Sequence, residues 1–127
     1  PLSLVDSFPA GVPVAFVSSL ADRVVPLAST RRIAYALAAR GANPVFLCVL
    51  GRSSHSGYPL ENDEDKLLYA RFVHALLRMY GLPYVRAFAD GAESDRLLEA
   101  CRVRPEQALK LLAIGMDVSR DDRVSRN

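Results

Sequence analysis

The chain has 127 residues and a mass of 13.9 kDa, and half of its residues are hydrophobic, so it is long and apolar enough for one domain with a buried core and is not a disordered protein. Its 16 basic and 14 acidic residues leave a net charge of +2, so charge alone does not point to a nucleic-acid partner. No apolar stretch approaches the roughly 20 residues of a membrane segment. Cys48 and Cys101 lack the spacing of a metal site. We therefore expect two free buried thiols, no metal, no cofactor and a reducing intracellular compartment.

The first predicted elements are a strand, a helix and a second strand. Residues 12–18 form an apolar, β-branched run, which predicts a buried strand of a parallel sheet. A helix is predicted over 27–40, because Pro26 suits a helix start and Gly41 suits its end. Residues 45–50 predict a second buried strand. Two strands joined by a helical crossover are expected to be parallel neighbours, with both carboxyl ends at one edge of the sheet.

A loop over residues 51–59 follows the second strand, and helices are predicted beyond it. Asn62 is placed to cap a helix over 63–80. Its expected inward face consists of Leu67, Leu68, Phe72, Leu76 and Met79. Two shorter helices, over 92–101 and 105–115, are expected to form a helical hairpin that packs on the main unit or on a partner.

These elements predict an α/β fold with three parts. Residues 1–81 are expected to be the main α/β unit, and residues 82–116 a helical extension. Residues 117–127, rich in Asp, Arg and Ser, are expected to be a mobile tail.

Two residues with catalytic chemistry follow the two predicted strands. Asp22 comes directly after the first strand and His55 comes shortly after the second, so both are expected at the same edge of the sheet. A carboxylate that accepts a hydrogen bond from Nδ1–H fixes the tautomer of a histidine, and it stabilises the imidazolium that forms when Nε2 takes a proton from a nucleophile. We therefore predict that Asp22 and His55 lie within hydrogen-bond reach as the acid and base of a catalytic triad.

The element Asp22-Arg23-Val24-Val25-Pro26 after an apolar strand, followed by a helix, a strand and a histidine loop, resembles the C-terminal part of the α/β-hydrolase superfamily. The likeness spans roughly residues 12–80. It is nearest to Bem46-like, monoacylglycerol-lipase-like and prolyl-oligopeptidase-like serine hydrolases. It implies that the chain holds the C-terminal part of a three-layer parallel sheet, with Asp22 as triad acid and His55 as triad base. Ser54 departs from the family pattern, since a glycine often precedes the histidine there.

The Gly-x-Ser-x-Gly nucleophile elbow of this superfamily is absent from the sequence. Ser53 and Ser56 lie in the histidine loop, not at a strand-to-helix turn. The resemblance therefore implies a nucleophile upstream of this chain and a small-molecule acyl substrate, either an ester, a thioester or a peptide. Leu20, Val24 and Tyr58 are candidates for the acyl-binding side. The upstream part of the same protein, or a partner chain, is expected to cover the open edge of the sheet.

Other interpretations remain open. The chain is also consistent with a non-catalytic, hydrolase-derived subunit held in a larger assembly. Taken singly, Asp22 fits a loop hydrogen-bond acceptor and His55 fits a surface residue. A nucleotide-binding unit ranks lower, because residues 18–21 contain no glycine. His74 lies within a predicted helix, where a surface or packing role is expected.

Overall fold

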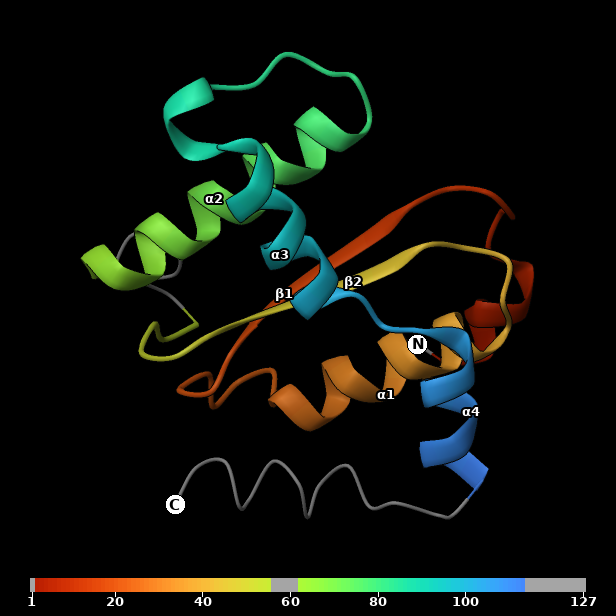
Figure 1. The fold of residues 1–127 in the computed structure, drawn as a ribbon. Coiled ribbons are helices and arrows are strands. Elements are labelled where there is room, and N and C mark those ends of the chain that lie inside the picture. The colour runs from red at the N-terminus through yellow and green to blue at the C-terminus, as the bar shows by residue number, and fades with distance from the viewer. Residues whose placement is uncertain (1, 56–61, 114–127) are drawn as a thin grey trace.

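The structure is a computed structural model that describes residues 2–55 and 62–113 (Figure 1). Its centre is a pair of parallel strands, with helices on both faces. In chain order the elements are η1 (Leu2–Ser7), β1 (Val14–Ser19), α1 (Leu27–Ala39), β2 (Val45–Leu50), α2 (Asp63–Met79), η2 (Arg86–Phe88), α3 (Gly91–Cys101) and α4 (Pro105–Ala113).

The two strands are parallel neighbours, as the sequence predicts. Val14 pairs with Val45 at one end and Ser19 pairs with Leu50 at the other, so both carboxyl ends lie at one edge of the sheet. The bounds of β2 match the prediction. β1 begins two residues later and ends one residue later than predicted. Its end extends past residue 18 because the N–H of Leu20 donates to the carbonyl of Leu50 at 2.9 Å.

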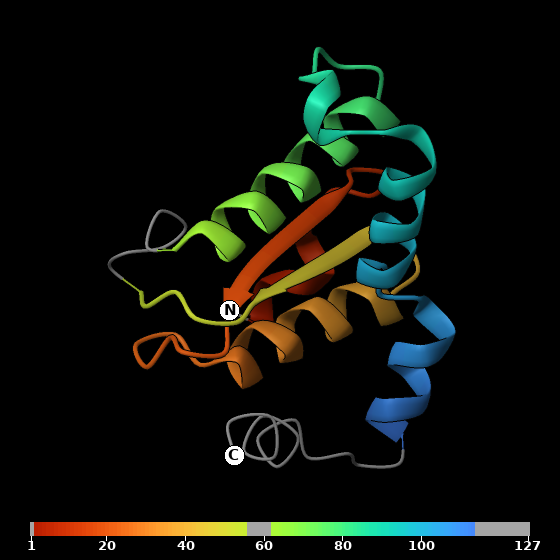
Figure 2. The same cartoon turned by 60° about the vertical axis from the view of Figure 1, so that its left-hand side comes forward.

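Side chains of β2 alternate between two apolar clusters, one on each face of the sheet. Figure 2 shows α1 and α2 on opposite sides of the two strands. Phe46, Cys48 and Leu50 pack with α2 and α3, whereas Val45 and Leu47 pack with α1 and α4. This two-sided burial explains why the sequence of β2 shows no polar alternation. Both cysteines are free, and Cys48 is fully buried.

β1 is less buried than its apolar sequence predicts. Ser18 and Ser19 are buried at its end, but Ala15 is exposed and the remaining residues are only half-buried. The reason is that β1 pairs on one side only within the described residues, so its other edge is open.

The last two helices pack on opposite faces of the sheet, so the expected helical hairpin does not form. α3 packs against α2 and β2, while α4 packs against α1. The link between them passes along the outer side of β2, where Arg102 forms a bridge with Phe46 and the N–H of Val103 donates to the carbonyl of Val45 at 2.9 Å. Residues 82–113 therefore cover one edge and both faces of the sheet. The predicted end of α4 at residue 115 and the tail lie outside the described residues.

The ends of α2 follow its sequence signals. The side chain of Asn62 accepts a hydrogen bond from the N–H of Asp65 at 2.9 Å, and Gly81 follows the helix with a φ of 71° that favours glycine. The predicted inward face is wrong at two positions, since Leu67 is 41% exposed and Met79 is 49% exposed. The sheet and α3 cover only part of the apolar surface of α2, and the rest of that surface stays exposed. No helix within the described residues is both long and apolar enough to cross a membrane.

Candidate functional site

Asp22 lies in the turn that leaves the carboxyl end of β1. Its N–H donates to the carbonyl of Ser19 at 3.2 Å, and the residue is only 8% exposed. The turn is reinforced by the hydroxyl of Ser19, which accepts from the N–H of Ala21 at 3.3 Å. The end of the strand therefore fixes where the Asp22 carboxylate lies.

The structure brings Asp22 and His55 together, as the sequence predicts. Nδ1 of His55 lies 3.1 Å from Oδ2 of Asp22. The pair forms because parallel pairing of β1 and β2 places their following loops at the same sheet edge. Since the ionised carboxylate can only accept, Nδ1 carries the hydrogen and Nε2 is the basic nitrogen.

The second carboxylate oxygen of Asp22 holds its own loop. Oδ1 accepts from the N–H of Val24 at 2.9 Å and from the N–H of Val25 at 3.0 Å. The loop-acceptor interpretation of Asp22 and the triad interpretation thus describe different oxygens of one side chain. Burial raises the pKa of Asp22, but the hydrogen bonds from Val25, His55 and Val24 outweigh that effect and hold the pKa below its ordinary value. Asp22 is therefore an anion at neutral pH.

The imidazole of His55 is held on one side and open on the other. Its side chain is 51% exposed, and Nε2 forms no hydrogen bond with any other described residue. A histidine oriented through Nδ1 with an accessible Nε2 can take a proton from a nucleophile and return it to a leaving group. The arrangement suits a general base that serves an incoming group.

A third residue, Asp65 in the first turn of α2, holds the loop that leads to His55. Its Oδ1 accepts from the N–H of Gly51 at 3.2 Å. Its Oδ2 accepts from the N–H of Arg52 at 3.0 Å, the N–H of Ser53 at 2.7 Å and the hydroxyl of Ser53 at 2.6 Å. One carboxylate thus collects three successive backbone donors of the histidine loop. The loop is tied to α2 before the chain reaches His55.

The Asp65 carboxylate is almost completely buried, with 3% of the residue exposed. Burial raises its pKa, but the Ser53 hydroxyl, the Asn62 side chain and the backbone donors of Arg52 and Gly51 lower it more, to about 2. An anion so well satisfied stabilises the loop at neutral pH. The Arg52 ion pair with Glu64, at 3.8 Å, is exposed and adds little.

Sequence reasoning missed Asp65 and Ser53. A signal was present, since Asn62 and Asp65 stand at the N-cap and N3 positions that a capping box uses. In the usual capping box the N3 acid reaches back to the N-cap residue. Here Asp65 accepts from the side chain of Asn62 at 3.2 Å, and it also binds the preceding loop, which the pattern does not reveal.

The remaining residues of the predicted site are placed as follows. The hydroxyl of Ser53 donates to Asp65 in a fully buried position and is no nucleophile. Leu20 is half-buried, and Val24 is 70% exposed at the same sheet edge. Ser54 adopts no positive φ, so the loop here does not need a glycine. Ser56 and Tyr58 lie outside the described residues.

His74 has the packing role expected of it. Its Nδ1 accepts from the N–H of Val85 at 3.0 Å, and its ring stacks on Phe88 with centroids 5.3 Å apart. These contacts fix η2 against α2. His74 is therefore unconnected with the Asp22 and His55 pair.

Within the described residues, no three His, Cys, Asp or Glu side chains gather in a way that could hold a metal ion. Comparison of the chain with protein-family models, with curated proteins and with solved structures finds no match in any of the three. The functional argument therefore depends on the geometry of the site.

Proposed function

We propose that the chain is the C-terminal segment of a serine hydrolase of the α/β-hydrolase type, in which Asp22 is the acid and His55 the base of the catalytic triad. The nucleophile would come from a part of the protein that precedes this segment. The substrate would be a small molecule with an ester, thioester or peptide bond, and the reaction would pass through an acyl-enzyme.

The observation that carries the proposal is the 3.1 Å contact between Asp22 Oδ2 and His55 Nδ1 at the carboxyl edge of two adjacent parallel strands. The geometry is the one that the chemistry needs. Asp22 is ionised and accepts through Oδ2, which leaves Nε2 of His55 to face a nucleophile. When Nε2 takes the proton of a serine hydroxyl, the Asp22 anion stabilises the imidazolium. The same proton is then donated to the leaving group.

The fold supports the proposal in a second way. Helices on both faces of a parallel sheet form the three layers expected of this superfamily. The open side of β1 suits a further strand, since an apolar groove of about 180 Å³ lies beside it, lined in part by Ala15, Leu76 and Tyr80. We propose that the upstream part of the protein covers this edge.

Labelling with a fluorophosphonate, which reacts with activated serines, tests the proposal on the intact protein. We expect labelling of the unaltered protein and none of His55→Ala, because an unassisted serine hydroxyl is a poor nucleophile. His74→Asn is the matched control, since Asn keeps an acceptor for the Val85 N–H and the residue lies outside the pair. It should label normally. Equal labelling of the His55→Ala protein would overturn the proposed role of His55.

The alternative is a non-catalytic subunit derived from a hydrolase. This alternative is favoured by the exposed apolar residues at the C-terminal end of α2, which suit an interface with another chain. They include Met79, Tyr80 and Leu82. The same labelling experiment separates the two functions. An intact protein that folds with the Asp22 and His55 contact in place but takes no label would support the subunit.

A further inference from the structure

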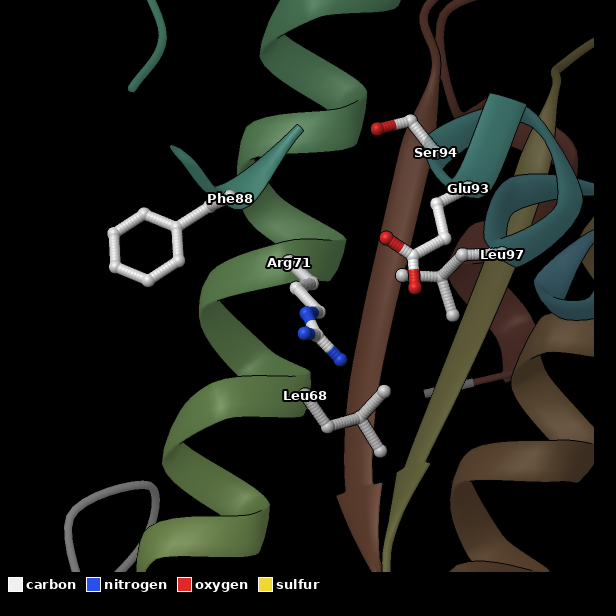
Figure 3. A pocket seen from close by; sticks show the side chains of 6 residues that line it. All are labelled: Leu68, Arg71, Phe88, Glu93, Ser94 and Leu97. Carbon is white, nitrogen blue, oxygen red and sulfur yellow. The ribbon is translucent and has the colours of Figure 1, made fainter. Parts of the chain in front are cut away.

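A small cavity of about 150 Å³ opens between α2, η2 and α3, away from the Asp22 and His55 pair. Figure 3 shows the side chains around it. The lining residues are Leu68, Arg71, Phe88, Glu93, Ser94 and Leu97. The cavity combines an apolar lining with one positive group, one negative group and one hydroxyl.

The two charged side chains come from opposite helices and extend toward the same space. Arg71 reaches out from α2 and Glu93 from α3 (Figure 3). Neither forms an ion pair or hydrogen bond with any other residue that the structure describes. Elsewhere in the same helix pair, Arg78 and Asp95 do meet, at 3.4 Å. Arg71 and Glu93 form no such pair, and both are exposed residues whose charges a ligand in the cavity can reach.

The hydroxyl of Ser94 adds a third polar group. Ser94 is only 4% exposed, and it lines the cavity next to Glu93. A hydroxyl at a cavity wall can donate a hydrogen bond to a ligand in place of a water molecule.

The wall at η2 is held in place by contacts outside the cavity. Phe88 stacks on His74 with 25° between the ring planes, and the N–H of Val85 donates to His74. Phe88 is thus fixed on the side of α2 and does not fold inward to fill the space. Leu68 from α2 and Leu97 from α3 provide the remaining apolar surface.

We propose that this cavity binds a small zwitterion of the α-amino-acid class. The carboxylate would pair with the Arg71 guanidinium and the ammonium with the Glu93 carboxylate. The Ser94 hydroxyl would donate to the ligand carboxylate, and an aliphatic side chain would contact Leu68 and Leu97. An unpaired positive group and an unpaired negative group at one cavity favour a molecule that carries both complementary charges. This site does not depend on the proposed hydrolase function.

The size of the cavity limits the ligand. Pockets for drug-sized molecules have volumes of about 300 to 1,000 Å³. At about 150 Å³, this cavity has the volume of roughly five water molecules in the liquid. A single amino acid fits this size class, whereas a nucleotide or a peptide does not.

Three probes that share one carbon skeleton test the proposal: L-leucine, 4-methylpentanoate, which lacks the amine, and 3-methylbutylamine, which lacks the carboxylate. Each is titrated into the intact protein while the NMR signals of Leu68 and Leu97 methyl groups are followed. We expect L-leucine to shift these signals and to bind at least about tenfold more tightly than either partial analogue.

Variants then assign the two charges. Arg71→Gln should weaken L-leucine about tenfold or more while leaving 3-methylbutylamine unchanged, and Glu93→Gln should do the same while leaving 4-methylpentanoate unchanged. Arg32→Gln on α1 and Glu106→Gln in the first turn of α4 are matched controls, because both are exposed helical residues away from the cavity. They should bind L-leucine normally.

Three results would overturn the proposal. The first is no shift with L-leucine up to about 10 mM, which is weaker than ordinary metabolite binding. The second is equal affinity for all three probes, which would reveal a merely apolar crevice. The third is unaltered L-leucine binding in both cavity variants. None of these readouts involves hydrolysis, so a failure here is distinguishable from a failure of the proposed enzyme.

Discussion

The Oδ2 atom of Asp22 lies 3.1 Å from Nδ1 of His55, although 33 positions separate the two residues in the chain. The parallel pairing of β1 with β2 brings the two loops together. Oδ1 of Asp22 holds the first loop, and the Asp65 carboxylate holds the second. Each member of the pair is therefore fixed by its own set of backbone hydrogen bonds.

Under the proposed hydrolase function, Asp22→Asn is expected to abolish most hydrolysis without unfolding the protein. The amide oxygen of Asn can still accept from Val24 and Val25, so the loop persists. Its NH₂ group then faces His55 and favours the tautomer with hydrogen on Nε2, which cannot act as a base. We expect kcat in the intact protein to fall by roughly 10⁴-fold, with melting temperature little changed. Asp63→Asn is the control. Unchanged hydrolysis in the Asp22→Asn protein would exclude Asp22 from the mechanism.

Asp65→Asn is expected to destabilise the protein through the histidine loop. The change removes a buried anion that satisfies three backbone donors and the Ser53 hydroxyl, and the amide NH₂ group cannot accept. We expect the free energy of unfolding to fall by about 2 to 4 kcal/mol in urea titrations. Asp63→Asn, in the same helical turn but fully exposed, should change it by less than about 0.5 kcal/mol. Equal effects of the two changes would contradict the role given to Asp65.

The stability that Asp65 contributes should depend on pH in acid. The pKa of Asp65 is lowered from 3.8 to about 2 on folding, so the unfolded chain binds the proton more readily. The stabilisation is complete above about pH 4 and is lost as the pH falls through about 2. The loss amounts to about 2 kcal/mol. Urea unfolding across this range should show the difference between the unaltered protein and Asp65→Asn shrinking as the pH falls, and a constant difference would be inconsistent with the lowered pKa.

The 127-residue chain prepared alone should self-associate and should not hydrolyse esters. Within the described residues the outer edge of β1 has no partner, and an apolar groove lies beside it. Ala15→Lys places a charge in that groove and should reduce association, whereas Ser29→Lys on α1 adds the same charge elsewhere and should not. Sedimentation at several concentrations and an ester assay measure both. A stable, active monomer would mean that the segment is a complete enzyme.

Leucine-to-alanine substitutions at a buried and at an exposed position test which residues of α2 and α3 face the core. Leu98 on α3 is 2% exposed, and Leu98→Ala should cost about 2 to 5 kcal/mol because it leaves a cavity. Leu67→Ala on α2 should cost less than about 1 kcal/mol, since Leu67 is 41% exposed and leaves no closed cavity when shortened. Chemical unfolding of the two variants provides the comparison. A large loss at Leu67 would restore the broader inner face that the sequence predicts, or would indicate that another chain covers it.

The sequence by itself determined the elements and the order of Asp22 and His55 along them. The bounds of β2, the cap at Asn62 and the helix end at Gly81 follow from local chemistry, because apolar runs, capping side chains and positive φ act within a few residues. The common edge of Asp22 and His55 also followed, since one helical crossover between two buried strands allows few arrangements.

Only the tertiary structure decided which long-range contacts these elements make. Asp65 binds a loop 12 to 14 positions earlier, and a capping pattern does not specify such a partner. The exposure of Leu67 depends on how much of α2 its neighbours cover, which helical periodicity leaves open. The separation of α3 from α4 follows from the bridge between Arg102 and Phe46, because that contact carries the chain past β2 to the other face. These features depend on packing between segments that are distant in the sequence. The secondary-structure propensity of each segment contains no information about that packing.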